Sequence, residues 1–186
     1  MRKVVLSVGM SLDGRIARTD GSVDFLFMPK DYSMGPFMAR IDTAVMGRKT
    51  YEVALRLGRG TMGGPGMKSY VFSRTQALGE RGGVTFVNEP PKKLLAALRE
   101  RRGKDIWLMG GGELAGEFLK DDLVDELHLG IVPVLIGEGI PLFLPGFAQR
   151  DFSLSENKSY AKGMISLKYE RRRKGAKRRQ VRKRLG

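Results

Sequence analysis

The order of apolar and polar positions predicts a chain in which short strands alternate with short helices. Apolar runs rich in β-branched residues predict buried strands at residues 4–9, 43–46, 69–72, 84–87 and 106–109. Apolar positions three and four residues apart, together with start and stop signals, predict helices at 29–40, 50–57, 91–101 and 113–119. Three further strands are predicted in direct succession, at 126–134, 152–158 and 164–169.

This alternation indicates the fold class and the domain boundary. Strands that alternate with helices favour parallel pairing, whereas strands in direct succession favour antiparallel pairing. We therefore expect an α/β protein with a mixed, mostly parallel sheet between helices and an antiparallel edge at its C-terminal end. Residues 58–67, with five glycines and one proline, predict a flexible loop. No linker divides the body, so residues 1–170 are expected to form one domain.

Composition narrows the possible chemistry. The chain has 186 residues, of which 41% are hydrophobic, enough for one domain with a real core. It has no cysteine and a single histidine, His128, which excludes thiolate chemistry and multi-histidine metal sites. No apolar run approaches the roughly 18 residues of a membrane span. The apolar stretch at the N-terminus is too short for a signal peptide, so we expect a cytoplasmic protein.

The net charge of +14 is concentrated at one end of the chain. Residues 171–186 hold ten Lys and Arg and no acid, which leaves 24 basic and 20 acidic residues in the body. Like charges repel one another, so the pattern favours a solvated, mobile extension. The alternative is an arm that binds nucleic acid weakly through its phosphates, without sequence preference, because the segment has no aromatic residue for base stacking.

Three strand ends carry groups suited to phosphate. Gly110, Gly111 and Gly112 lie between a predicted strand and a helix, where they favour either a pyrophosphate site or a tight turn. Gly47, Arg48, Lys49 and Thr50 also open a helix, and Ser73, Arg74 and Thr75 follow another strand. A helix cap or a solvated loop would explain either cluster alone, but all three together predict one polyphosphate ligand along one sheet edge. No acidic residue follows the glycine run at the Rossmann spacing, so that motif is excluded.

These segments also identify a resemblance. The chain resembles the dihydrofolate reductase superfamily, and within it the reductase domain of riboflavin biosynthesis and its stand-alone relatives. The resemblance covers residues 2–170 through motifs in the same order, at 10–17, 45–52, 65–75, 106–113 and 125–129. It implies a three-layer α-β-α fold, an NADPH-dependent reductase and, in many relatives, a homodimer, for which the antiparallel C-terminal edge offers a contact.

The resemblance implies a cofactor site residue by residue. Gly47, Arg48, Lys49 and Thr50 match positions that meet the pyrophosphate and the adenosine phosphate, and Ser73, Arg74 and Thr75 match the 2′-phosphate side. The glycine run, with Glu113 and Leu114 after it, matches the segment beneath the nicotinamide ribose and the pyrophosphate. Gly9 and Ile16 match positions whose backbone touches the nicotinamide.

Two carboxylates are candidates for the proton donor that accompanies hydride transfer. Asp31, near the start of the predicted helix at 29–40, matches the acid of the pterin pocket, and its alternative role is to stabilise that helix N-terminus. Asp13 lies in a segment that borders the substrate in the riboflavin branch, and its alternative role is an Asp-Gly turn.

Departures from the superfamily pattern limit the substrate. Met67 stands where dihydrofolate reductases place an arginine for the folate carboxylate, and Leu26 and Gly35 replace the aromatic residues that flank the acid. We therefore expect a small nitrogen heterocycle or a related carbonyl compound rather than dihydrofolate. One alternative is the diaminohydroxyphosphoribosylamino-pyrimidine reductase of riboflavin biosynthesis. Another is a non-catalytic nucleotide-binding protein whose basic tail binds polyanions.

Overall fold

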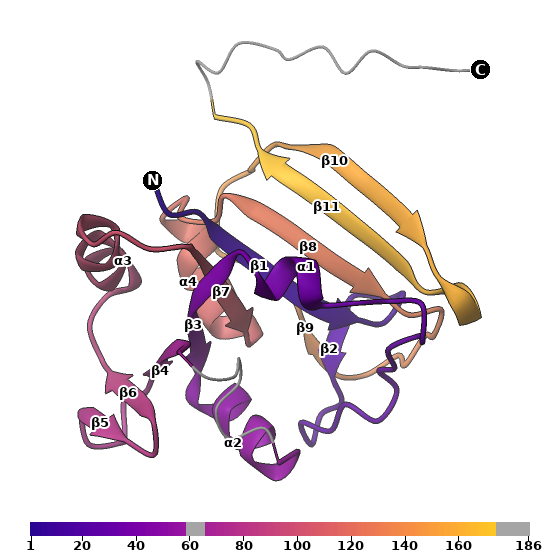
Figure 1. The fold of residues 1–186 in the computed structure, drawn as a ribbon. Coiled ribbons are helices and arrows are strands. Elements are labelled where there is room, and N and C mark those ends of the chain that lie inside the picture. The colour runs from indigo at the N-terminus through magenta and orange to yellow at the C-terminus, as the bar shows by residue number, and fades with distance from the viewer. Residues whose placement is uncertain (59–65, 174–186) are drawn as a thin grey trace.

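A nine-stranded sheet forms the centre of the molecule in the computed structural model, which describes residues 1–58 and 66–173 (Figure 1). Its strands are β1 (Val4–Met10), β3 (Ile41–Gly47), β4 (Lys68–Phe72), β5 (Gly79–Arg81), β6 (Val84–Val87), β7 (Asp105–Gly110), β8 (Glu126–Ile131), β10 (Phe152–Ser159) and β11 (Ile165–Arg171). The strand order is β10-β11-β8-β1-β7-β3-β4-β6-β5. A separate two-stranded sheet pairs β2 (Arg15–Ala17) with β9 (Ile140–Pro141).

Parallel pairing fills the middle of the large sheet. β1 pairs in parallel with β7 and β8, and the parallel pairs β7–β3, β3–β4 and β4–β6 continue the sheet. Antiparallel pairs lie at both edges: β8–β11 and β11–β10 at one, β6–β5 at the other. The predicted mixed, mostly parallel sheet with an antiparallel C-terminal edge is therefore confirmed. The β5 edge and the small β2–β9 sheet were not predicted, because segments of two or three residues are too short to show a period.

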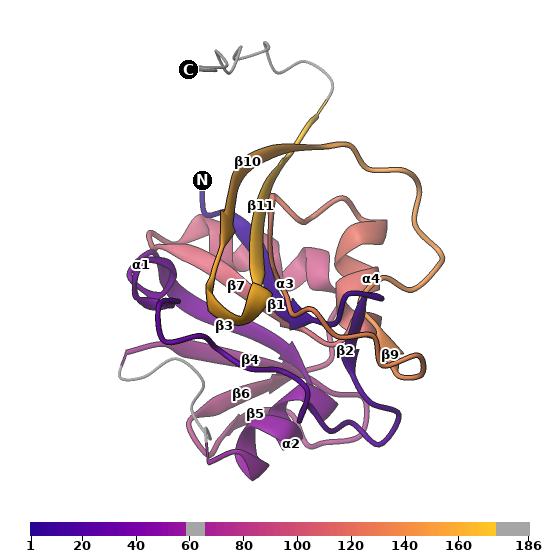
Figure 2. The same ribbon diagram turned by 90° about the vertical axis from the view of Figure 1, so that its right-hand side faces the viewer.

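Helices cover both faces of the sheet, so the predicted three layers are confirmed (Figure 2). Successive side chains of a strand point to opposite faces. Val4 and Leu6 accordingly pack toward α3 (Pro91–Glu100) and α4 (Gly112–Lys120), whereas Val5 packs toward α1 (Gly35–Met38). The face of α1 also carries α2 (Arg48–Arg56), whose Tyr51 packs on Phe86 of β6.

The predicted helix at 29–40 is wrong. Only α1, four residues long, forms there, and residues 29–34 make turns. Pro36 lies in the first turn of α1, where its missing N–H costs nothing, but its ring disfavours helical backbone in the preceding residue. The helix therefore begins at Gly35, directly before the proline, instead of running through it from residue 29, and Asp31 does not lie at a helix start.

Two other boundaries move. β8 ends at Ile131, two residues before Pro133, which has no N–H for strand pairing. β11 extends through Arg171, beyond the predicted end of the domain at residue 170. Arg171 pairs with Asp122, and Arg173 pairs with Asp122 and Asp125, so residues 171–173 pack against the body. The rest of the predicted tail, residues 174–186, lies outside the described residues, as does most of the predicted loop at 58–67.

Ion pairs join the strands at the amino edge of the sheet, where the parallel strands begin. Glu126, at the start of β8, receives hydrogen bonds from Lys3 at 2.6 Å and from Arg40 at 3.0 Å, and Arg40 also pairs with Asp105 of β7. Arg2 pairs with Asp42 of β3. These contacts join β1, β3, β7 and β8 at their starting ends, so any open site on the sheet is expected at the opposite edge.

In the described ranges, no helix is long and apolar enough to cross a membrane.

Candidate functional site

The predicted phosphate-binding segments meet at the carboxyl edge of the sheet, where the parallel strands end. β7, β3 and β4 are neighbours, and in their register Met46 lies beside Gly110 and Gly47 beside Phe72. The segments that follow these three strands therefore lie next to one another, in the order 110–112, 47–50 and 73–75. Gly9, near the end of β1, completes the row on the side of β7 away from β3.

Two helices begin side by side at this edge, each with a glycine as its N-cap. Gly47 precedes α2 and Gly111 precedes α4, and within the described residues neither helix start receives a side-chain cap hydrogen bond. A Cβ built on Gly47 would lie 4.0 Å from the carbonyl oxygen of Gly110 and from the nitrogen of Gly111. The first backbone N–H groups of a helix have no partner within the helix and attract anions. Two such sets of donors next to each other suit a ligand with two phosphates.

The three glycines of the run are needed for different reasons. Gly110 has φ +94°, a backbone conformation that side chains disfavour. A Cβ on Gly112 would lie 2.6 Å from the carbonyl oxygen of Pro141, so close packing within the protein requires that glycine. A Cβ on Gly111 would reach only an ordinary contact, 3.5 Å from Oγ1 of Thr50. Of the three, Gly111 is therefore the glycine that neither backbone conformation nor packing within the protein requires, so its missing side chain points to a ligand.

The cations at this edge differ in how free they are. Arg48 donates a hydrogen bond of 2.5 Å to Glu52 one helical turn away, so part of its guanidinium is already engaged. Arg74 is 85% exposed, and its only ion-pair contact among the described residues is to Glu113, at 3.9 Å. Lys49, in the first turn of α2, is exposed. Arg74 is thus the guanidinium best placed to turn toward a phosphate.

Ser73, Thr75 and Leu114 have less to offer a ligand through their side chains. Ser73 is buried, and its Oγ accepts hydrogen bonds from the backbone N–H groups of Gln76 at 3.0 Å and Thr75 at 3.3 Å. The Ser73 hydroxyl therefore stabilises the loop, and toward a ligand it can offer only its O–H as a donor. Thr75 is exposed, and the side chain of Leu114 is buried in the core, so only its backbone N–H faces the helix start.

Gly9 and Ile16 lie near the segment that leads to Asp31. A Cβ on Gly9 would meet both methyl groups of Leu26 at 3.4 Å, so Leu26 covers this part of β1. Ile16, in the middle of β2, is partly buried and packs against the main core. Leu26 therefore lies beside the end of β1. Asp31 lies at the same end of the sheet, because its carboxylate contacts the turn before β11, and the first residue of β11, Ile165, pairs with the last residue of β8, Ile131.

Asp13 is held by four groups. Its carboxylate accepts hydrogen bonds from the Ser11 hydroxyl at 2.6 Å and from the backbone N–H groups of Gly137 at 2.9 Å and Ile136 at 3.3 Å. The guanidinium of Arg15 lies 3.9 Å away. The Ser11 hydrogen bond, followed by those of Ile136 and Gly137, lowers the pKa of Asp13 below its ordinary value. Asp13 therefore stays ionised near neutral pH and ties two loops together, which is a poor setting for a proton donor.

Asp31 is exposed, and its carboxylate accepts hydrogen bonds of 3.1 and 3.3 Å from the backbone N–H of Ala161, in the turn between β10 and β11. The neighbouring Tyr32 packs edge-on against Tyr160 of the same turn, with ring centroids 5.1 Å apart. These contacts join residues 29–34 to the end of the β10–β11 hairpin. Asp31 keeps free lone pairs on an open surface, so of the two predicted acids it is the more available.

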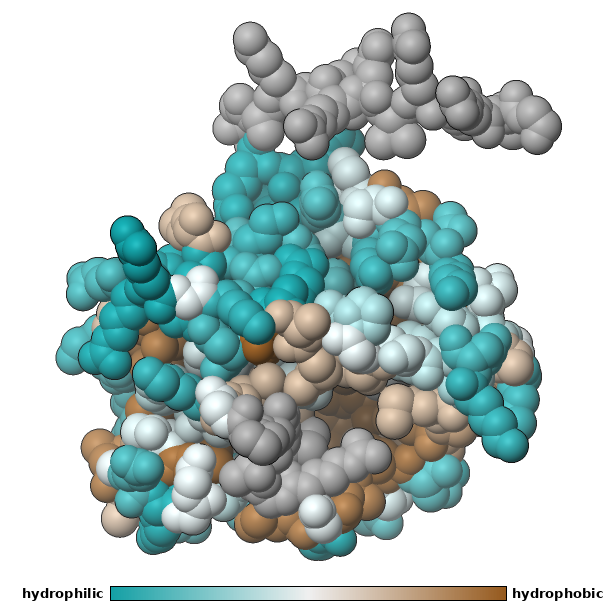
Figure 3. Space-filling view, viewed as in Figure 1, coloured by the Kyte–Doolittle hydropathy of each residue, from teal (hydrophilic) through white to brown (hydrophobic). Residues whose placement is uncertain are grey.

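A cavity of about 350 Å³ lies beside the helix start of α2, and most of its lining was not predicted. It is lined by Arg48, Tyr51, Glu52, Leu55, Gln76, Arg81 and Phe86. The guanidinium of Arg81 lies over the ring of Phe86, 4.7 Å from its centroid. Apart from Arg48, the only signal in the sequence for this region is the position of Gln76 directly after the 73–75 cluster. Figure 3 shows a further hollow, walled mainly by apolar residues, near the carboxyl ends of β1 and β7.

Comparison with known proteins gives consistent matches. Residues 2–166 match the RibD C-terminal domain. Two uncharacterized proteins of Bacillus subtilis (strain 168) are similar in sequence. YwjB is 38% identical, and the match covers 76% of this chain and 83% of YwjB. YyaP is 31% identical, and the match covers 90% of this chain and 94% of YyaP.

Solved structures give the same result. A crystal structure from Shewanella sp. PV-4, of a protein named for riboflavin biosynthesis, has a TM-score of 0.79 and 27% identity, covering 93% of this chain and 100% of the other. A pyrimidine reductase-like protein from Corynebacterium diphtheriae has a TM-score of 0.69 and 19% identity, covering 92% of each chain. At 19% identity, the second match shows a shared fold alone.

Proposed function

Because the chain belongs to the RibD C-terminal domain family, we propose that it is an NADPH-dependent oxidoreductase acting on a small nitrogen heterocycle or a related carbonyl compound. The substrate class we have in mind is pterin-like or pyrimidine-like. The observation that carries the proposal is the pair of uncapped helix starts, at Gly47 and Gly111, side by side on the carboxyl edge of the sheet. The donors there suit a pyrophosphate, which this cofactor contains.

The phosphates of the cofactor would be held mainly by backbone donors. The N–H groups at the starts of α2 and α4 would bind the pyrophosphate, with the Thr50 hydroxyl beside them. Arg74, with Lys49 and the free part of Arg48, would bind the 2′-phosphate. A fork of guanidinium donors fits a phosphate well, which favours NADPH over the cofactor without that phosphate.

The cavity beside α2 would take the adenine end. It opens next to Arg48 and Gln76, within reach of the groups assigned to the 2′-phosphate. Its wall contains the guanidinium of Arg81 stacked on Phe86, a flat surface on which a base can stack. The open space over Gly111 would take the ribose and the nicotinamide, beside Gly9.

The cofactor, when bound, supplies the hydride, and the protein has to deliver a proton to the reduced group. Asp31 is our candidate for this role, because its carboxylate is exposed and lies at the carboxyl end of the sheet, on the turn between β10 and β11. Asp13 would act as a positioning residue: it fixes the loop at residues 11–14 against the loop at 136–137.

The diaminohydroxyphosphoribosylamino-pyrimidine reductase of riboflavin biosynthesis is the more specific alternative. It is supported by the family match and by the name of the Shewanella protein. A substrate of this kind carries a ribose phosphate, so it would need a cation close to the hollow near β1 and β7. Our candidate is Arg15, whose Nε is buried and has no hydrogen-bond partner among the described residues. Arg15 pairs with Pro141 of β9, whose carbonyl oxygen packs against Gly112 at the proposed cofactor site.

A cofactor titration followed by turnover tests the proposal. Binding of NADPH would be measured by fluorescence, and its oxidation at 340 nm would then be followed against pterins, pyrimidine ribosyl phosphates and simple carbonyl compounds. Saturable NADPH binding with turnover of one of these classes would support a reductase. Saturable binding without turnover of any would favour the non-catalytic nucleotide-binding alternative, and no binding would contradict both.

A further inference from the structure

A second cavity lies at the amino edge of the sheet, opposite the proposed cofactor site. It has a volume of about 90 Å³ and is lined by Arg2, Asp42, Thr43, Gly66, Lys68, Tyr70, Leu98, Arg101 and Arg102. The strand residues among them stand at the starts of β3 and β4, whereas Gly47 and Ser73 follow the ends of those strands. The cavity and the cofactor site are therefore at opposite ends of the same strands.

Among the described residues of the cavity wall, the only carboxylate, that of Asp42, is already paired with a cation. Asp42 pairs with Arg2 and accepts hydrogen bonds from the Thr43 hydroxyl at 2.8 Å and the backbone N–H of Lys104 at 2.7 Å. Arg2, 8% exposed, also donates to the carbonyl oxygens of Lys104 and Leu98 and to the Thr43 hydroxyl. Burial raises the pKa of Asp42, but the Lys104 and Thr43 hydrogen bonds and the charges of Arg2 and Lys68 outweigh it and lower that pKa overall.

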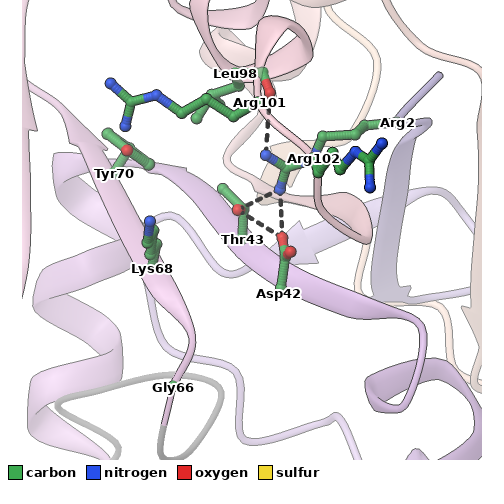
Figure 4. A pocket seen from close by; sticks show the side chains of 9 residues that line it. All are labelled: Arg2, Asp42, Thr43, Gly66, Lys68, Tyr70, Leu98, Arg101 and Arg102. Atoms are coloured by element: carbon green, nitrogen blue, oxygen red, sulfur yellow. Dashed lines mark hydrogen bonds and ion pairs between the residues drawn. The ribbon is translucent and has the colours of Figure 1, made fainter.

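The other cations of the wall lack such partners. Across residues 1–58 and 66–173, neither Lys68 nor Arg101 forms an ion pair with a carboxylate. In Figure 4, Lys68 and Tyr70 lie on one side of the cavity and Arg2, Thr43 and Asp42 on the other. Arg101 lies near Tyr70, whereas the guanidinium of Arg102 points away to the other side. The cavity is thus a small concave space with an excess of positive charge.

The backbone is built to keep this arrangement in place. A Cβ on Gly103 would lie 2.7 Å from Oδ2 of Asp42 and 2.9 Å from Cζ of Arg2, so a glycine is needed there for the pair to form. Because Arg2 and Asp42 are fixed, Lys68 and Arg101 are the groups free to move toward a ligand. A cavity of this size holds a few water molecules, or one small anion in their place.

We propose that this cavity is a binding site for a single phosphate group, either free phosphate or the terminal phosphate of a small ester. Lys68 and Arg101 would contact it directly, with the Tyr70 hydroxyl as a further donor. The guanidinium of Arg2, held behind Thr43, would add its charge. The small, concave shape favours a terminal phosphate over the diester backbone of a nucleic acid. This site does not depend on the proposed reductase activity.

Titration with inorganic phosphate at constant ionic strength tests the site on the full-length protein. Amide signals of Thr43, Lys68 and Tyr70 would be followed by NMR, with glycerol phosphate and a 12-base-pair DNA duplex as the other two probes. We expect saturable shifts of these signals with phosphate, with glycerol phosphate, or with both, which tells free phosphate from an ester. The double variant Lys68→Gln, Arg101→Gln should bind about tenfold more weakly or worse, because it loses two charge-assisted contacts.

The control is Lys92→Gln, Lys120→Gln, which removes the same charge from residues that do not line the cavity. It should keep the affinity of the unaltered protein, and thermal unfolding would show that both double variants fold. Equal affinity in the two variants would overturn the proposal. So would the absence of saturable shifts with both small probes, or shifts of these signals with duplex DNA alone.

Discussion

The hydroxyl oxygen of Thr50 lies 3.5 Å from the point where a Cβ of Gly111 would stand. These residues belong to different strand-to-helix connections, and the contact between them places two helix starts around one open space. The space is large enough for one added methyl group without a clash, which makes Gly111 a sensitive point for testing the cofactor site.

Gly111→Ala should weaken NADPH binding and leave folding intact. The backbone of Gly111 has φ −65°, which alanine adopts freely, and the added methyl makes only ordinary contacts within the protein. It would, however, fill the space over which a ligand has to pass. We expect a loss of roughly tenfold in affinity, the scale of about 1–3 kcal/mol for overfilling a packed site, measured by fluorescence titration.

Gly112→Ala should behave in the opposite way, because its Cβ would lie 2.6 Å from a backbone carbonyl oxygen. It should lower the unfolding temperature, and Gly116→Ala, with no heavy atom within 4 Å of its Cβ, is the control that should not. Unchanged NADPH affinity in folded Gly111→Ala would argue against the site.

Arg74→Ala should weaken NADPH binding and leave NADH binding nearly unchanged. The exposed guanidinium is assigned to the 2′-phosphate, and a charge-assisted contact contributes about 1.5–3 kcal/mol, or roughly tenfold or more in affinity. Titration of both cofactors against the variant measures the difference. Lys92→Ala, at the start of α3, serves as the charge control. An equal loss for both cofactors would remove Arg74 from this role.

Asp31→Asn should reduce turnover with little effect on NADPH affinity. The amide keeps an oxygen that accepts a hydrogen bond from the Ala161 N–H, but unlike a carboxylic acid it cannot donate a proton to the substrate. General acid catalysis contributes about 10²–10⁴-fold to a rate, so we expect kcat to fall by at least that lower factor and its pH dependence to change. Asp13→Asn should instead lower the unfolding temperature, since it weakens the bond between two loops. Full activity in Asp31→Asn would show that the proton comes from elsewhere.

Stability should fall as the pH drops below the ordinary pKa of Glu126, 4.5. Burial raises the pKa of Glu126, but hydrogen bonds from His128, Arg40 and Lys3 outweigh it and hold the pKa far below that value in the folded protein. An acid whose pKa is lower in the folded than in the unfolded state stabilises the fold at pH values above the unfolded-state pKa. This stabilisation is lost as the pH falls toward the folded-state pKa.

Urea unfolding between pH 7 and pH 3 measures this effect. Glu126→Gln should be about 2 kcal/mol less stable at pH 7, because Lys3 loses its carboxylate partner and Arg40 keeps only Asp105. The stability of this variant should also depend less on pH. Glu156→Gln is the control, because that carboxylate is half exposed and, among the described residues, pairs with Lys168 alone. The same pH slope in Glu126→Gln as in the unaltered protein would mean that other carboxylates dominate.

Removal of residues 174–186 should leave folding and NADPH affinity intact. The cut belongs after Arg173, because Arg171 and Arg173 pair with Asp122 and Asp125. We expect weak binding of the full-length protein to duplex DNA, lost on truncation. Contacts to five phosphates would give a log–log salt slope of about −4.5. Tight DNA binding by the truncated protein at physiological salt would place a nucleic-acid surface on the body.

The fold was predictable from the sequence where the pattern is local. Apolar runs predicted the strands of the parallel core. The position of Gly47 and of Gly110–Gly112 between a strand and a helix predicted that they lie at the same edge of the sheet. The helix predicted at 29–40 is wrong because Pro36 disfavours a helix through the residues before it, whatever the period of the apolar residues. The roles of Asp13 and Asp31 were not predictable, since their partners Gly137 and Ala161 are 124 and 130 residues away. The amino-edge cavity was missed for the same reason: its walls come from separate parts of the chain. The predicted homodimer stays a prediction, because a single chain does not test it.

The central position of β1 in the sheet has a consequence for folding during synthesis on the ribosome. The first strand made pairs with Ile106–Leu108 of β7 and with residues 126–131 of β8, all more than a hundred positions later. Its apolar side chains therefore have no native neighbours in the sheet until residues 106–131 have left the exit tunnel. Such long-range pairing slows folding and leaves an incomplete chain open to aggregation. We infer that this protein folds late in synthesis, and that nascent chains released before β8 is complete are the species most in need of a chaperone.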